Sequence, residues 1–237
     1  MMPSEPESDL RANLALVRQQ LARAATDYPL PRLIAVTKTH PVDRILPLRA
    51  LGVTEIGENR VQEIREKLPG LGPDFRVHMI GRLQTNKVKY IIEDVCLIQS
   101  VDRMELAREI DRQAAKHNRR MPVLIQVSPV GEVQKGGIAI DALRPFLVEL
   151  SHMDALDVRG LMAVMPNLQN TETLDALFAR MRALFEQMRS EAIAGIRMDE
   201  LSMGMSHDYV LAARHGATMV RIGSALFGPR AAAPHNE

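Results

Sequence analysis

An apolar run that ends in a lysine occupies residues 33–41, which read Leu33-Ile34-Ala35-Val36-Thr37-Lys38-Thr39-His40-Pro41. Its first five residues have the aliphatic and β-branched character of a strand buried in a parallel sheet. In parallel α/β folds, the residue just past the carboxyl end of a strand faces the ligand site. A lysine that is partly desolvated at such a place can form a Schiff base with a carbonyl ligand. The alternative interpretation is that Lys38 is a solvated loop residue.

Seven further strand-like segments follow this one, and helix-like segments separate them. This alternation, with no linker, predicts an α/β fold, namely a single (β/α)8 TIM-like barrel rather than an open sheet. The chain length of 237 residues suits one such barrel. The predicted strands cover residues 33–37, 54–56, 76–80, 95–98, 123–127, 158–161, 200–202 and 219–222.

The helical spacing of apolar residues predicts one helix before the first strand and seven after it. Ser8 and Asp102 have the residue types of N-terminal caps for two of these helices. We expect an N-terminal helix region at 1–32 that packs on the barrel, the barrel itself at 33–230, and a disordered tail at 231–237. The predicted helices cover residues 8–25, 43–51, 60–68, 86–93, 103–117, 141–152, 171–191 and 206–215.

The composition argues against several classes of protein. Hydrophobic residues make up 46% of the chain and aromatic residues only 3%, which predicts an aliphatic core. A net charge of +1 with dispersed arginines gives no sign of binding to nucleic acid or to a membrane. Cys96 is the only cysteine, so an intrachain disulfide is impossible, which fits a reducing cytoplasm. The sequence shows no membrane-spanning run and no metal-ligand spacing. We expect no signal peptide, because Met1-Met2-Pro3-Ser4-Glu5 lacks the charged-then-apolar order of one.

Loops rich in glycine and serine follow the last two predicted strands. They read Ser202-Met203-Gly204-Met205-Ser206 and Arg221-Ile222-Gly223-Ser224. In (β/α)8 barrels these two loops often bind phosphate, because glycines let backbone N–H groups approach an anion. Each loop alone is also what a tight turn requires. A phosphate site and an amine facing one cavity meet the needs of pyridoxal 5′-phosphate (PLP), which we predict as the cofactor.

The pyridine nitrogen of PLP also needs a partner, and Arg221 is the candidate. A guanidinium only donates hydrogen bonds, so it would keep that nitrogen unprotonated and make the ring a weaker electron sink. A salt bridge inside the barrel is the alternative role for Arg221. His78 is either a neighbour of the ring or a core histidine, and Asn59 either lines the pocket or caps the next helix. Met205 lies in the same region, where methionines suit packing of the barrel better than binding.

Several motifs of the chain together resemble those of the YggS/PROSC family, the pyridoxal phosphate homeostasis proteins (PLPBP). They run in order from about residue 33 to residue 230, so the resemblance covers nearly the whole chain. The matching segments are Ala35-Val36-Thr37-Lys38-Thr39, Gly57-Glu58-Asn59-Arg60-Val61-Gln62-Glu63, His78-Met79-Ile80-Gly81-Arg82-Leu83-Gln84-Thr85-Asn86-Lys87, Lys135-Gly136-Gly137-Ile138, Arg159-Gly160-Leu161-Met162, Leu201-Ser202-Met203-Gly204-Met205-Ser206 and Val220-Arg221-Ile222-Gly223-Ser224-Ala225-Leu226-Phe227-Gly228.

The resemblance implies a barrel like the N-terminal domain of alanine racemase (fold type III), with PLP held on Lys38 as an internal aldimine. It also implies a phosphate site around Ser206, a pyridine nitrogen facing Arg221 and a pocket lined by Asn59. No catalytic residue and no metal ligand are expected. The complete expected set of cofactor-binding residues is Lys38, Asn59, His78, Ser202, Met205, Ser206, Arg221, Gly223 and Ser224.

Members of this family are regarded as carriers or regulators of vitamin B6. The resemblance therefore implies a cytoplasmic, monomeric protein without enzymatic turnover that binds PLP and supplies it to apo-enzymes, with effects on amino-acid balance. An amino-acid racemase is the alternative, and it needs a second acid or base, for which Tyr28, Tyr90, Tyr209 and Lys135 are the candidates. A third interpretation is a phosphate-sugar barrel enzyme that forms no Schiff base.

Overall fold

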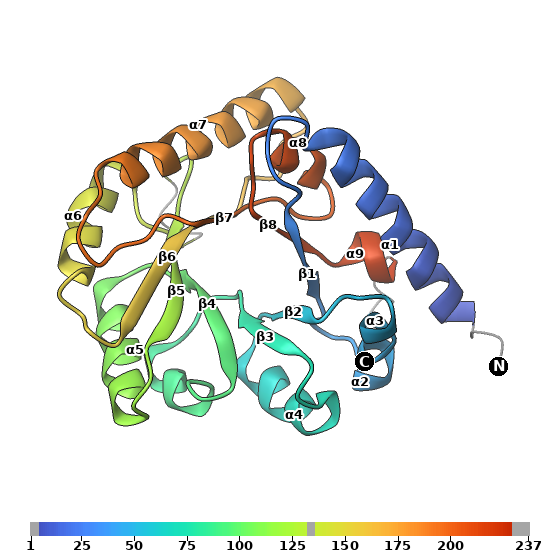
Figure 1. Ribbon diagram of the computed structural model, residues 1–237, viewed down its shortest axis with the longest axis horizontal. Helices are drawn as coiled ribbons and strands as arrows, with labels where there is room; N and C mark the ends of the chain where they lie inside the picture. The colour runs from blue at the N-terminus through green and yellow to red at the C-terminus, as the bar shows by residue number, and fades with distance from the viewer. Residues whose placement is uncertain (1–4, 132–135, 229–237) are drawn as a thin grey trace, which may run out of the picture.

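A closed barrel of eight parallel strands forms the centre of the molecule (Figure 1). The computed structural model describes residues 5–131 and 136–228. Each strand is hydrogen-bonded to the next in chain order, and β8 closes the barrel on β1. The predicted (β/α)8 barrel is therefore confirmed. The strands are β1 (Arg32–Val36), β2 (Glu55–Glu58), β3 (Arg76–Met79), β4 (Val95–Val101), β5 (Met121–Val127), β6 (Leu156–Ala163), β7 (Glu200–Ser202) and β8 (Met219–Ile222).

Helices surround the barrel, and α1 lies along its outside next to α8 and α9 (Figure 1). Leu14, Val17 and Leu21 of α1 are buried in this contact, and Asn13 Nδ2 donates a hydrogen bond to Leu226 O at 2.9 Å. The tail at 231–237 lies outside the described residues. The helices are α1 (Glu5–Ala24), α2 (Val42–Ile45), α3 (Pro47–Ala50), α4 (Val61–Leu71), the 3-10 helix η1 (Thr85–Tyr90), α5 (Met104–Lys116), α6 (Ile140–Leu150), α7 (Thr171–Ser190), α8 (Tyr209–Arg214) and α9 (Ser224–Phe227).

Three of the predicted helices differ from the structure. The helix predicted at 43–51 is split, because Pro47 has no N–H to continue α2 and instead occupies the first turn of α3. The segment predicted as a helix at 86–93 forms the tighter η1. The helix predicted from residue 206 begins only at Tyr209, because residues 206–208 form a turn. The short α9 has no counterpart in the prediction.

Both predicted caps are wrong. Ser8 lies inside α1, which begins at Glu5. Arg103, rather than Asp102, is the N-cap of α5, and no side chain caps that helix. The Asp102 carboxylate instead accepts a hydrogen bond from Arg103 Nη1 at 2.5 Å.

The interior of the barrel is packed rather than open. A small apolar cluster forms there separately from the larger core between strands and helices. Such a plug is typical of (β/α)8 barrels and leaves the two ends as the places where ligands have access. The cluster consists of Ile34, Leu97, Leu124, Met162 and Met219.

The register of β1 and β8 brings two distant segments of the chain together. Ile34 lies opposite Arg221, and Ala35 lies opposite Ile222. The loops that leave the carboxyl ends of these two strands, with Lys38 in one and Gly223 in the other, are therefore neighbours.

Candidate functional site

The loops that follow the strands meet at one end of the barrel, which we call the mouth. A cavity of about 180 Å³ opens there between the loops after β2, β3, β4, β5 and β6. A smaller cavity of about 100 Å³ adjoins it between the loops after β5 and β6. The larger cavity is lined by Asn59, Ile80, Gly81, Arg82, Asp102, Gln126, Gly136 and Val164.

Lys38 stands two residues after the end of β1 and is partly buried. Hydrogen bonds fix the backbone on both sides of it. Thr37 N donates to Gly57 O at 3.1 Å, and Lys67 Nζ donates to Thr37 O at 2.9 Å. Thr39 N donates to Glu63 Oε2 at 2.6 Å, and Thr39 has a positive φ of 68°. The lysine thus stands on a constrained loop rather than a freely mobile one, against the simplest form of the solvated-loop alternative.

A buried charged cluster stands behind this loop. Lys67 Nζ lies 2.7 Å from Glu58 Oε1 and 2.9 Å from Glu63 Oε2, and Thr37 Oγ1 donates to Glu58 Oε1 at 2.6 Å. Burial raises the pKa of Glu58, against the opposing effect of Lys67 and Thr37. Burial also acts to raise the pKa of Glu63, but the hydrogen bond from Thr39 and the charge of Lys67 outweigh it and lower that pKa. The cluster therefore braces the Lys38 loop with one cation between two carboxyl groups.

The loops after β7 and β8 are joined through one hydroxyl group. Ser206 Oγ accepts hydrogen bonds from Gly223 N at 3.1 Å and from Ala225 N at 3.2 Å. A Cβ atom on Gly223 would lie 3.3 Å from Val36 Cβ, so the backbone of this loop packs tightly against the end of β1. Amide donors thus converge near the Lys38 loop, which is the chemistry that a phosphate group requires. Ser224 is exposed at the start of α9.

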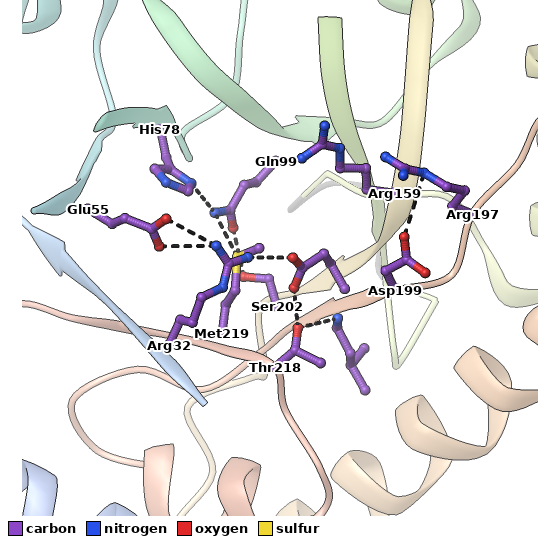
Figure 2. A network of polar contacts seen from close by, with 12 residues as sticks. Arg32, Glu55, His78, Gln99, Arg159, Arg197, Asp199, Ser202, Thr218 and Met219 are labelled. Atoms are coloured by element: carbon purple, nitrogen blue, oxygen red, sulfur yellow. Dashed lines mark hydrogen bonds and ion pairs between the residues drawn. The ribbon is translucent and has the colours of Figure 1, made fainter. Parts of the chain in front are cut away.

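A chain of hydrogen bonds crosses the barrel interior from β8 to β3. Arg221 donates from Nη1 to Ser202 Oγ at 2.6 Å and from Nη2 to Ala163 O at 2.8 Å. Figure 2 shows the next links, in which Ser202 Oγ lies 2.7 Å from Gln99 Oε1 and Gln99 Nε2 lies 3.0 Å from His78 Nδ1.

The direction of this chain follows from its first member. A guanidinium has no acceptor atom, so the Ser202 hydroxyl accepts a hydrogen bond from Arg221. The same hydroxyl donates a hydrogen bond to Gln99 Oε1. The Gln99 amide then donates from Nε2 to His78 Nδ1. This assignment of hydrogens places the proton of a neutral His78 on Nε2, an atom that has no hydrogen-bond partner among the described residues.

The charge states of the two ends of this chain are set by burial. Burial lowers the pKa of His78 to about 3, and Arg32 and Arg76 act in the same direction. Burial lowers the pKa of Arg221 to about 10, while the Asp208 carboxylate acts in the opposite direction. At neutral pH, His78 is therefore uncharged and Arg221 is charged. The hydrogen-bond partners of Arg221 are neutral, so a direct salt bridge is not its role among the described residues.

Asn59 and Met205 complete the predicted set. Asn59 lines the mouth cavity, and its Oδ1 atom is buried without a hydrogen-bond partner among the described residues. It does not cap α4, because Arg60 is the N-cap and no side chain caps that helix. Met205 is partly buried, and its backbone N donates to Asp208 Oδ1 at 2.5 Å.

Sequence reasoning missed Gln99 and Lys67. Gln99 is the one amide side chain in β4, so a long polar side chain inside a mostly apolar strand was an available signal. Lys67 lies four residues after Glu63 on a helix, a spacing that is usually an exposed pair, and only the fold makes it buried. Lys135, a candidate acid or base, lies outside the described residues.

The candidate tyrosines are placed away from the cavity lining. Tyr209 OH donates to Gln20 Oε1 of α1, and the Tyr28 ring lies against the Arg182 guanidinium at 4.6 Å. Tyr90 is 40% exposed on η1. Among residues 5–131 and 136–228, no three His, Cys, Asp or Glu side chains are grouped to bind a metal, and no helix is long and apolar enough to cross a membrane.

Comparison with known proteins gives a consistent result. Residues 7–231 match the family model for the alanine racemase N-terminal domain. The pyridoxal phosphate homeostasis protein of Aquifex aeolicus is 39% identical over 92% of this chain and 95% of its own length.

Solved structures agree. PipY of Synechococcus elongatus PCC7942, solved with PLP bound, superposes with a TM-score of 0.82 at 37% identity, over 92% of this chain and all of PipY. Alanine racemase of Clostridium difficile superposes with a TM-score of 0.77 over 97% of this chain and 58% of its own chain. That pair is 16% identical, so the second likeness concerns the fold alone.

Proposed function

Because the chain belongs to the family of pyridoxal phosphate homeostasis proteins, we propose that it binds PLP at the barrel mouth and takes part in intracellular PLP homeostasis. In this role it keeps the reactive aldehyde bound and supplies the cofactor to apo-enzymes, with effects on amino-acid balance. The observation that carries the proposal is the junction of the β7 and β8 loops at Ser206, placed beside the loop that bears Lys38.

The residues present fit the chemical groups of PLP. Ser206, Gly223 and Ser224 offer hydroxyl and amide donors for the phosphate, and Lys38 offers the amine for the aldehyde. Arg221, which is held by Ser202, offers an N–H group that can donate a hydrogen bond to the pyridine nitrogen. The Oδ1 atom of Asn59 is buried at the cavity wall without a hydrogen-bond partner among the described residues, and a bound molecule can supply that partner. Bound PLP supplies an electrophilic carbonyl carbon and a conjugated ring that can withdraw electrons.

Arg221 bears on whether this site turns over amino acids. A group that only donates keeps the ring nitrogen unprotonated, which weakens the electron withdrawal that carbanion chemistry uses. No described tyrosine lines the mouth cavity to act as a second acid or base. These features support carriage of the cofactor rather than catalysis.

The experiment that tests the proposal is the visible absorbance spectrum of the purified protein after incubation with PLP. We expect a band of covalently linked cofactor in the wild type and its loss in Lys38→Ala. Lys116→Ala is the matched control, because Lys116 is an exposed lysine at the end of α5. A wild type that stays colourless would reject the proposal and favour a phosphate-sugar barrel. Exchange of the amino-acid α-proton at enzymatic rates would instead favour a racemase.

We also propose that the protein works as a monomer in the cytoplasm. The lone Cys96, partly buried beside the interior apolar cluster, is consistent with a reducing compartment. Light scattering should give the mass of one chain, 26.4 kDa. A mass twice as large at working concentrations would contradict the monomer.

A further inference from the structure

A large groove lies beside the mouth cavity, outside the loops that bear Lys38, Ser206 and Gly223. It has a volume of about 770 Å³ and runs between the start of α4, the β3–η1 segment and the start of α5. Asn59 and Arg82 line both this groove and the mouth cavity, so the two are adjacent. Whatever occupies the groove therefore lies next to the opening through which a bound molecule must leave.

The groove is lined by cations and by no carboxylate. Its charged lining residues are Arg60, Arg82, Lys87 and Arg103. Just outside the lining, Asp102 lies 2.5 Å from Arg103 and 3.9 Å from Arg82, and Glu63 interacts electrostatically with Arg60. Arg60 and Lys87 form no ion pair with any residue in the described ranges. The lining itself thus carries four cations and no carboxylate, in a chain whose net charge is only +1.

The positive surface continues from the groove over η1. The ring of Tyr90, 40% exposed, is approached by Lys89 Nζ at 4.9 Å, by Arg65 at 5.2 Å and by Lys87 Nζ at 5.7 Å from its centroid. The ring face attracts these cations, but they repel one another. Neither Arg65 nor Lys89 forms an ion pair with another described residue. An anionic partner would relieve this repulsion.

We propose that this surface, formed by the groove and by Arg65, Lys89 and Tyr90, docks an acidic face of the apo-enzyme that receives PLP. The inference rests on the proposed function and adds the place where the recipient binds. Its charge calls for an acidic partner. The groove, with a volume of about 770 Å³, is larger than one small anion fills. Tyr and Arg, here the exposed Tyr90 and the neighbouring Arg65, are residue types enriched at protein interfaces. Docking there places the recipient beside the mouth, so the cofactor can pass without crossing bulk solvent.

The first test measures binding to the surface without the cofactor. The probe is a fluorescent oligoglutamate peptide, and its anisotropy is titrated at low ionic strength. Lys87→Glu/Lys89→Glu should weaken binding about tenfold or more. Arg11→Glu/Arg23→Glu is the matched control, because it changes the net charge by the same amount on exposed positions of α1, on another flank of the barrel (Figure 1). Equal weakening by both pairs, or displacement of the peptide by inorganic phosphate at the same ionic strength, would overturn the proposal.

The second test measures transfer. The PLP-loaded protein is mixed with an acidic PLP-dependent aminotransferase in its apo form, and recovery of aminotransferase activity is followed. With the wild type we expect a rate that rises with apo-enzyme concentration and falls with salt. The Lys87/Lys89 variant should bind PLP with an unchanged spectrum, transfer it about tenfold more slowly and lose the salt dependence. A rate independent of salt in the wild type would overturn the docking surface. Failure to bind PLP would overturn the proposed function and leave the peptide result standing.

Discussion

The two ends of the barrel treat their polar groups differently. At the amino end, charged side chains pair with one another. Arg32 bridges Glu55 and Glu200, and Arg197 lies 2.9 Å from Asp157 (Figure 2 shows the Arg32 part). At the mouth, Asn59 Oδ1 and the nearby Glu58 Oε2 have no hydrogen-bond partner among the described residues. The charged groups at the amino end thus pair with one another, whereas the mouth keeps acceptor atoms that a bound molecule can pair with.

The ion pairs at the two ends also differ in how deeply they are buried. The amino-end pairs are solvated, with 44% of the Arg32 side chain exposed, whereas the Lys67–Glu58 pair near the mouth is 10% and 1% exposed. Solvated pairs contribute little free energy, but loss of one member of a buried pair leaves an unpaired charge. Sequence alone does not distinguish these cases, because both consist of ordinary Arg, Lys and Glu residues.

The largest expected effect concerns His78, which lies between the two ends. Its folded pKa of about 3 is below the ordinary 6.5, so the unfolded chain binds the proton first. The free energy of unfolding should therefore fall as the pH falls below 6.5, by about 1.4 kcal/mol per unit and about 3 kcal/mol by pH 4. Urea unfolding at several pH values measures this slope. His78→Gln should reduce it, and the exposed His152→Gln should not. Equal slopes in all three proteins would contradict a neutral, buried His78.

The second effect compares a buried ion pair with a solvated one. Lys67→Met should lower the free energy of unfolding by about 3 kcal/mol at pH 7, because it leaves Glu58 and Glu63 together without their cation. Arg32→Met should cost about 1 kcal/mol or less, because its pairs are solvated. Denaturant unfolding of the two variants decides the matter. Similar losses would mean that the two ends of the barrel are not energetically distinct.

The smallest effect compares two hydroxyl groups that each join neighbouring segments. Thr218 Oγ1 accepts from Leu201 N at 2.9 Å and donates to Glu200 Oε2 at the amino end, as Ser206 Oγ accepts from two amides at the mouth. Ser206→Ala and Thr218→Ala should each cost about 1 kcal/mol of stability. Only Ser206→Ala should also weaken PLP binding, by about tenfold, as measured by absorbance titration. A similar loss of binding in Thr218→Ala would remove the distinction.

The fold could be predicted because its signal repeats. Eight β-branched or aliphatic runs alternate with helical patterns, and this alternation fixes the barrel even where single boundaries are wrong. Features that depend on a single residue, such as a helix cap, were harder to predict. Asp102 has the residue type of a cap, but the neighbouring Arg103 guanidinium binds its carboxylate instead.

The candidate site was predictable where it follows from strand ends. Asn59 and Gly223 come directly after a strand, and Lys38 two residues after one, so the topology alone places all three at the same end of the barrel. The supporting contacts were not predictable in this way. The chain from Arg221 through Gln99 to His78 joins residues up to 143 positions apart, and its direction depends on hydrogen-bond geometry that has no sequence pattern.

The one-way hydrogen bonds of that chain have a consequence for observing the molecule. Because each link can point in only one direction while Arg221 is charged, the imidazole nitrogens of His78 register the state of the guanidinium at the mouth. The nitrogen chemical shifts of His78 would thus indicate whether a ligand is bound at the mouth. A ligand that draws Arg221 away from Ser202 would free the hydroxyl to rotate, and the chemical shifts of the two ring nitrogens on β3 would change with it.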